Sequence, residues 1–190
     1  SGPVTAPLAA GVELVIRVAT ADGKPVAGAN VVALARAGKA TVRRRALTGD
    51  DGTATLPPVS EGRLEVYAHR AGFAWAVVTV DARPGGGETR LVLSPGHRLR
   101  LVVEDPDGLP LAGVAVRSVA RADTAAGAPD PMDPDGLPWT TDADGVLRVE
   151  DLPDREVDLY LGRAGYGEEI VARVRPGATT WFATLVRAKR

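Results

Sequence analysis

The fold of this chain is decided by the stretch Asp22-Gly-Lys-Pro-Val-Ala-Gly-Ala-Asn-Val31, which returns as Asp107-Gly-Leu-Pro-Leu-Ala-Gly-Val-Ala-Val116. The two copies are offset by 85 residues. Self-similarity at such an interval indicates repeated structural units. The 190 residues suffice for two domains of about 90 residues each.

Two further markers repeat downstream of this stretch. The segment Thr48-Gly-Asp-Asp-Gly52 recurs as Thr141-Asp-Ala-Asp-Gly145, and Arg70-Ala-Gly-Phe73 recurs as Arg163-Ala-Gly-Tyr166, both at an offset of 93. The second copy therefore carries eight extra residues between its first and second markers. We place them in an inserted loop at 123–139, which is rich in Pro, Gly and Asp.

Between the markers the sequence predicts short strands. The segments 64–68 and 157–161 alternate apolar and polar residues with period two, so that Leu64, Val66 and Ala68 would face a core. Further strands are expected at 14–18, 31–34, 75–80 and 90–93, and at 99–103, 114–116, 170–174 and 181–186. The prediction is an all-β chain of two tandem Ig-like or prealbumin-like β-sandwich domains. Residues 1–11 form an N-terminal tail or linker, 12–95 the first domain and 96–190 the second.

The repeated Gly, Asp and Pro residues are expected to shape turns. Gly supplies a positive φ, Pro fixes φ at the exit of a turn, and Asp bonds to nearby backbone. The Thr-x-x-Asp-Gly segment is predicted to close a hairpin. The turn residues are Asp22, Gly23, Pro25, Gly28, Asp51, Gly52 and Gly72 in the first copy, and Asp107, Gly108, Pro110, Gly113, Asp144, Gly145 and Gly165 in the second.

Composition narrows the classes of function. The chain has no cysteine, a formal net charge of −1, and no apolar run long enough to span a bilayer. A general affinity for nucleic acid or an anionic membrane is not expected. We find no secretion signal at the start of the sequence, and Ser1-Gly2 is interpreted as the remnant of a tag.

No catalytic or cofactor site is predicted. His69 and His97 form no pair at ligand spacing and are expected to be solvent-exposed, and no serine lies in a G-x-S-x-G elbow. Without a nucleophile, a base or a metal site, the chain is not expected to be an enzyme.

Charged residues gather in two places. Asp130, Asp133 and Asp135 in the inserted loop form a weak candidate for a Ca²⁺ site, although prolines interrupt the spacing and a solvated acidic loop is the preferred interpretation. The run 43–45 holds three arginines, and strand alternation would send Arg44 to the opposite face from its neighbours. Residues 12–94 carry a net charge of +3 and residues 97–190 a net charge of −4, which favours a monomer capable of weak head-to-tail association.

The three tryptophans are candidates for ligand contact, because exposed aromatic rings stack on sugars. Trp75 shares strand parity with Phe73 and Val77, and packing in a core or between modules is expected for it. Trp139, beside Pro138 at the end of the inserted loop, is expected to be the most exposed aromatic. Trp181 opens the last strand and could face either way.

The order of the three markers resembles that of the carboxypeptidase regulatory-like family, whose members are transthyretin-like sandwiches similar to the B-type repeats of bacterial surface adhesins. The resemblance covers 12–94 and 97–187 and implies the fold. It implies no single activity, because such modules are appended to peptidases, glycan-degrading enzymes, transporters and adhesins. The expected function is a non-catalytic spacer or docking surface of a bacterial secreted or cell-envelope protein, located in the periplasm, at the outer membrane or outside the cell. The alternative is a carbohydrate- or peptide-binding accessory module of a larger enzyme or surface protein, with Trp139 and Trp181 at its site.

Overall fold

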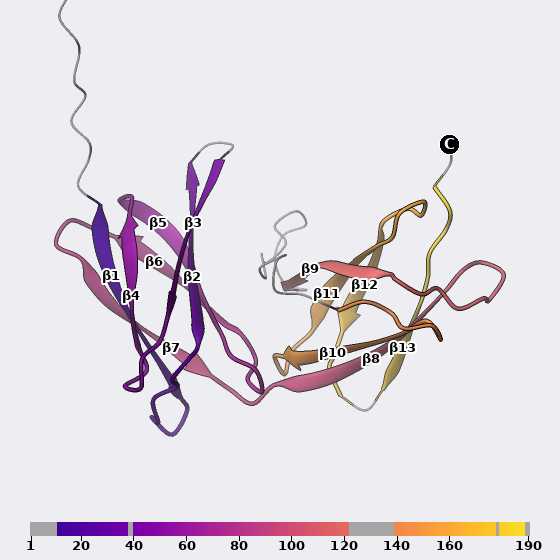
Figure 1. The fold of residues 1–190 in the computed structure, drawn as a ribbon, viewed down its shortest axis with the longest axis horizontal. Coiled ribbons are helices and arrows are strands. Elements are labelled where there is room, and N and C mark those ends of the chain that lie inside the picture. The colour runs from indigo at the N-terminus through magenta and orange to yellow at the C-terminus, as the bar shows by residue number, and fades with distance from the viewer. Residues whose placement is uncertain (1–10, 38–39, 122–138, 178, 189–190) are drawn as a thin grey trace, which may run out of the picture. The chain divides into compact units, whose positions relative to one another are not determined.

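The computed structural model describes residues 11–37, 40–121, 139–177 and 179–188. They form an all-β fold divided into two compact units, Ser1–Pro95 and Gly96–Arg190 (Figure 1). The predicted fold class is confirmed. The described part of the chain contains no helix that could cross a lipid bilayer.

The first unit is a sandwich of two sheets. One sheet has the order β4-β1-β7 and the other the order β3-β2-β5-β6. The strands are β1 Val12–Thr20, β2 Asn30–Ala37, β3 Ala40–Leu47, β4 Thr53–Val59, β5 Gly62–His69, β6 Ala76–Ala82 and β7 Gly87–Leu93.

The second unit repeats this arrangement with sheets of order β10-β8-β13 and β12-β11-β9. Its strands are β8 His97–Glu104, β9 Ala115–Arg121, β10 Val146–Leu152, β11 Val157–Gly162, β12 Glu169–Val174 and β13 Thr180–Thr184. Each of these corresponds to a strand of the first unit, but β3 has no counterpart within the described ranges. The inserted loop stands near the place where that counterpart would lie in the sequence, and 122–138 lie outside the described residues.

The core lies between the two sheets of each unit because alternate residues of each strand point inward. In the first unit Leu14, Ile16, Leu64, Val66 and Ala68 are all buried, so the predicted core face of β5 is confirmed. Leu99, Leu101, Leu147, Leu159 and Leu161 fill the same role in the second unit. Each buried Leu, Ile or Val side chain stabilises its unit by roughly 1.5–3 kcal/mol.

The first and last strands of each unit lie side by side and run in the same direction. In the first unit β1 pairs with β7 in parallel, in a continuous register from Leu14↔Gly87 to Thr20↔Leu93. In the second unit β8 pairs with β13 in parallel, from Arg100↔Thr180 to Glu104↔Thr184. Chain entry and chain exit of each sandwich are thus held together by one ladder of backbone hydrogen bonds.

The hairpin expected at the Thr-x-x-Asp-Gly segment is not present. The turn closes locally, with the amide of Gly52 donating to the carbonyl of Gly49 at 2.9 Å. The strands on either side, β3 and β4, belong to different sheets. The segment is a corner between sheets because its first residue, Thr48, bonds to the loop that precedes β2 rather than across a strand pair.

Candidate functional site

Two buried threonines hold the repeated markers together. The hydroxyl of Thr48 donates to the carbonyl of Val26 at 2.7 Å and accepts from the amide of Ala29 at 2.8 Å. Thr141 makes the same pair of bonds, to the carbonyl of Leu111 at 2.6 Å and from the amide of Val114 at 2.9 Å. Each hydroxyl satisfies two backbone groups that would otherwise be buried without a partner.

Further backbone bonds join the same two segments. In the first unit the amide of Gly28 donates to the carbonyl of Thr48, and the amide of Thr48 donates to the carbonyl of Ala29. In the second unit Gly113 and Thr141 stand in the same relation. The first and second markers of each repeat therefore form one structural element, which we call the threonine staple: Thr48 with Val26–Ala29, and Thr141 with Leu111–Val114.

The glycine that ends each Thr-x-x-Asp-Gly segment lies against the backbone of the first strand. Gly52 has a φ of 73°, and a Cβ atom there would lie 2.5 Å from the carbonyl oxygen of Val18. Gly145 has a φ of 70° and the same 2.5 Å approach to the carbonyl oxygen of Val103. Glycine is required at both places for its conformation and for its lack of a side chain.

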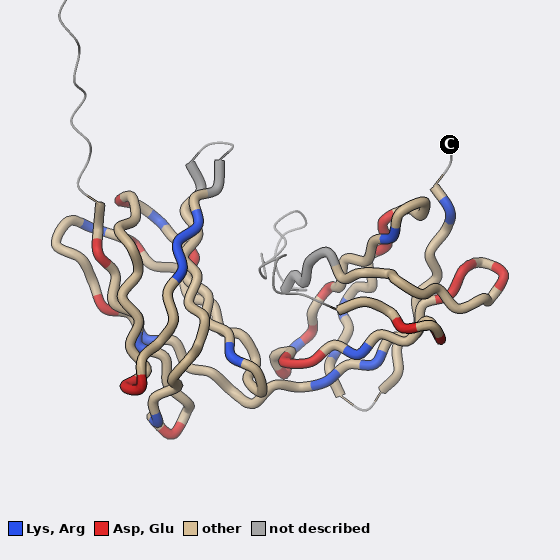
Figure 2. Tube along the Cα trace, viewed as in Figure 1, with Lys and Arg blue, Asp and Glu red and all other residues tan. Residues whose placement is uncertain are grey.

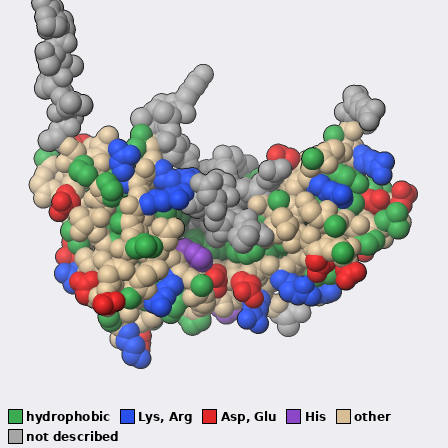
Figure 3. All heavy atoms as spheres, viewed as in Figure 1, with side chains coloured by type: hydrophobic (Ala, Val, Ile, Leu, Met, Phe, Trp, Pro, Cys, Tyr) green, Lys and Arg blue, Asp and Glu red, His purple; other side chains and the backbone are tan. Residues whose placement is uncertain are grey.

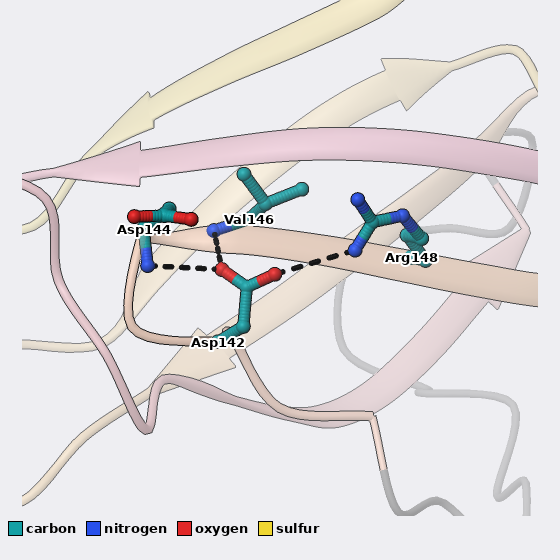
Figure 4. Close-up of polar contacts among 4 residues, drawn as sticks. All are labelled: Asp142, Asp144, Val146 and Arg148. Atoms are coloured by element: carbon teal, nitrogen blue, oxygen red, sulfur yellow. Dashed lines mark hydrogen bonds and ion pairs between the residues drawn. The ribbon is translucent and has the colours of Figure 1, made fainter.

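The aspartate beside each staple caps the turn (Figure 4). One carboxylate oxygen of Asp142 accepts from the amides of Asp144 at 3.1 Å and Val146 at 2.9 Å, and the other lies 3.3 Å from Nη1 of Arg148. The hydrogen bond from Val146 is the main reason that the pKa of Asp142 lies below its usual value. Asp51 accepts from the amide of Thr53 at 2.9 Å, and that bond likewise lowers the pKa of Asp51. Asp51 and Asp142 therefore stabilise the turns in which they lie.

The structure does not place the weak Ca²⁺ candidate, because Asp130, Asp133 and Asp135 lie outside the described residues. Within the described ranges, no group of three His, Asp or Glu side chains is arranged to hold a metal ion. The two histidines are partly buried rather than solvent-exposed. Each is held in or beside a strand, His69 at the end of β5 and His97 at the start of β8.

The three arginines of β3 lie on alternate faces of the sheet, as the sequence predicts. Arg44 pairs in register with buried Ala33, while Arg43 and Arg45 pair with Leu34 and Val32 on the other face of the sheet. Figure 2 shows the run as a continuous basic stretch of β3. The guanidinium of Arg44 donates from Nε to the carbonyl of Pro58 at 3.2 Å. This contact ties the edge of one sheet to the edge of the other.

Of the three tryptophans, Trp75 is buried as expected, and Trp139 is less exposed than expected. Trp75 is buried, with its indole Nε1 lacking a hydrogen-bond partner. Trp139 is half-buried, and its carbonyl accepts from the amide of Val116 in β9 at 3.1 Å. Trp181 pairs in register with buried Leu101 and therefore faces the core side of its sheet. The structure does not bring Trp139 and Trp181 together in any contact that it records.

The most exposed aromatic side chain among the described residues was not one of the candidates predicted from the sequence. Phe182, on β13, exposes 68% of its surface and pairs in register with Val102 on the outer face of the sheet. Elsewhere hydrophobic side chains stand among charged ones, as the face drawn in Figure 3 shows. A comparison of the two repeats would have found Phe182, because the equivalent residue of the first unit is the charged Arg90.

Residues 13–93 match the family model of the carboxypeptidase regulatory-like domain. A search of curated proteins gave no match.

Among solved structures, the minor pilin of Streptococcus agalactiae is similar, with 18% identity, coverage of 94% of this chain and 97% of that chain, and a TM-score of 0.39. A streptococcal ancillary pilin is 15% identical, with coverage of 94% of this chain and 63% of that chain, and a TM-score of 0.42. The shaft pilin of Lactobacillus rhamnosus GG is 12% identical, with coverage of 95% of this chain and 99% of that chain, and a TM-score of 0.32. These scores are too low to transfer any property of the pilins to this chain.

The family match covers the first unit from Glu13 to Leu93, that is, from the start of β1 to the end of β7. The second unit lies outside the matched range and repeats the strand order, the threonine staple and the parallel pairing of first and last strands. Residues 13–93, which make up the first unit, thus match the carboxypeptidase regulatory-like domain, and the second unit is built on the same plan.

Proposed function

We propose that this chain is a non-catalytic spacer that resists tension in a secreted or cell-envelope protein of a bacterium. The parallel pairing of the first and last strands in each unit supports this proposal. Because β1 and β7 run in the same direction, a pull on the two ends of the first unit drags the strands past each other. Every hydrogen bond of the ladder is then stretched at once.

A ladder that is sheared resists force better than one that is peeled. Backbone hydrogen bonds contribute about 0.5–1.5 kcal/mol each, so breaking them one at a time from an end needs little force at any moment. Breaking a whole register together needs the sum in a single step, and forced unfolding is governed by the height of that barrier. The register of the first unit spans the whole of β7.

The second unit places its ladder in the same way. β8 follows β7 after only Ser94, Pro95 and Gly96, and β8 pairs in parallel with the last strand, β13. A pull along the chain therefore loads the two ladders in series, and each is sheared. A spacer of this kind would serve a protein of the periplasm, the outer membrane or the cell exterior, where tension acts on anchored molecules.

Single-molecule pulling tests the proposal, and the absence of native cysteine makes attachment simple. A Glu13→Cys, Ser94→Cys variant applies force at opposite ends of the ladder and shears it. A Glu13→Cys, Gly87→Cys variant applies force at one end, because Gly87 pairs with Leu14, and peels it. Gly87 accommodates a side chain, since the nearest atom to its added Cβ is 3.9 Å away.

We expect the sheared variant to unfold at a force at least twofold higher than the peeled variant. Both variants load the same unit through the same position in β1, and they differ in the second attachment point. Equal forces in the two geometries would contradict the proposal.

A further inference from the structure

The outer faces of the two equivalent sheets differ at one row of residues. In the first unit the row across β4, β1 and β7 reads Thr53, Arg17 and Arg90. In the second unit the row across β10, β8 and β13 reads Val146, Val102 and Phe182. The second unit therefore carries an apolar stripe where the first carries two arginines; within it Phe182 is exposed, Val102 is half-buried and Val146 is buried.

The last strands also differ at their free edges. β7 presents Glu88 and Arg90 outward, and Glu88 forms an ion pair with Arg17. Charges of this kind protect an edge strand from pairing with another chain. β13 has no charged residue. The side chains of Thr180, Phe182 and Thr184 face outward from it. Among the residues that the structure describes, no strand pairs with the other side of β13.

The backbone of β13 is turned so that its even-numbered residues face the open edge. The amide of Leu185 donates to the carbonyl of Glu104, and alternate residues of a parallel strand bond to opposite sides. The N–H and C=O groups of Thr180, Phe182 and Thr184 consequently point away from β8. The residues with outward backbone groups are also those whose side chains form the outer face.

We propose that β13 pairs with β13 of a second copy of this chain, antiparallel and centred on Phe182. The pairing joins two three-stranded sheets into one and forms about six backbone hydrogen bonds. Phe182 lies opposite its own copy, so that the stripe of Val146, Val102 and Phe182 continues across both sheets.

The charges beside the stripe select this occupant and this direction. On one side of it Arg148 and Arg100 share a row with Thr180, and the guanidinium of Arg100 lies 3.3 Å from the hydroxyl of Thr180. On the other side Glu104 shares a row with Thr184. An antiparallel second copy brings the arginine row of each molecule in line with the glutamate row of the other. A parallel arrangement would align like charges, which is unfavourable.

The association is expected to be weak, because a five-residue edge gives an interface well below the area of a stable dimer. Sedimentation equilibrium on the full chain of 19.7 kDa, from about 10 μM to about 1 mM, should show the average mass rising towards twice that value. Phe182→Lys should abolish the rise. Leu109→Lys is the matched control: Leu109 is 61% exposed, lies in a turn, and its replacement should leave the rise unchanged.

A second variant guards against an effect of the lysine on folding. Thr184→Pro removes one outward N–H while leaving the bonds to β8 intact, as proline is tolerated at an open edge. It should also abolish the association, and the rise in mass of the wild type should persist in 1 M NaCl. A wild-type chain that stays monomeric at about 1 mM overturns the proposal. So does association that salt removes and that Phe182→Lys leaves intact, which is the behaviour of charge-driven head-to-tail contact.

Discussion

Replacing Thr48 by valine should destabilise the first unit selectively. Valine has the shape of threonine without the hydroxyl, so the change leaves the packing in place and removes the two bonds of the threonine staple. Because Thr48 is only 5% exposed, water cannot easily replace the lost hydroxyl. The carbonyl of Val26 and the amide of Ala29 are both left without that partner.

The magnitude follows from these two groups. A buried polar group without a partner costs about 1–3 kcal/mol, so for the two groups the free energy of unfolding of the first unit should fall by about 2–6 kcal/mol. Small domains are stable by only about 5–15 kcal/mol, so the loss is a large fraction of the whole. For a domain of this size each kcal/mol lost lowers Tm by about 4–8 °C. Thr141→Val should do the same to the second unit, since Thr141 makes the same bonds.

Urea unfolding followed by hydrogen exchange and mass spectrometry assigns the loss to a unit, because peptides from the two units are read separately. Thr48→Ser keeps the hydroxyl and should cost about 1 kcal/mol for the lost methyl group. Thr55→Val, at an exposed position on the outer face of β4, should have almost no effect. The explanation fails if Thr48→Val costs no more than Thr48→Ser, or if it weakens both units equally.

Three further outcomes are expected. Gly52→Ala should destabilise the first unit by more than about 3 kcal/mol, whereas Gly28→Ala, at a φ of 66° with open space around it, should cost only about 1–2 kcal/mol. An NMR titration should place the carboxyl pKa of Asp142 below about 3.9, so its contribution to stability is present above that pH and is lost as the pH falls through the folded-state pKa. A glycan array should show no binding that depends on Trp139, which is half-buried and tied to β9 through its carbonyl.

Each of these outcomes has a control and a contrary result. Equal losses for Gly52→Ala and Gly28→Ala would show that the close approach to the carbonyl of Val18 carries no cost. Asp142→Asn should remove the acid-dependent part of the stability curve, and an unchanged curve would contradict the assigned bonds. Binding of any glycan by the wild type that Trp139→Ala abolishes would favour the accessory-module alternative over the spacer.

The sequence was sufficient for those strands that have one face in a core and one in solvent. The sequences of β5 and β11 alternate because one face of each strand packs on the core. β3, β4 and β10 were not predicted as strands. β3 carries arginine on both of its faces, and β4 contains Pro57 and Pro58, which an edge strand tolerates and a central strand does not.

The candidate site was less predictable, because the role of each residue depends on which segment lies beside it in the fold. From the sequence alone Thr48 is a turn residue. Its role as a staple follows only from its hydrogen bonds to the loop 26–29. Trp181 and Phe182 are adjacent on one strand and must face opposite sides, but only the register with Leu101 and Val102 decides which of them faces out. Periodicity fixes which residues share a face, and it carries no information on which strand lies alongside.

The parallel ladder between β1 and β7 also sets the order of events during synthesis. β1 is made first, yet its neighbour on one side does not exist until Leu93 has left the ribosome or the secretion channel. Leu91 and Leu93 are both buried in the core, so a nascent chain that stops short of them has an open edge and an incomplete interior. Contacts between residues so far apart in sequence slow folding. Each unit should therefore remain a client of chaperones until its final strand arrives, and close in one late step.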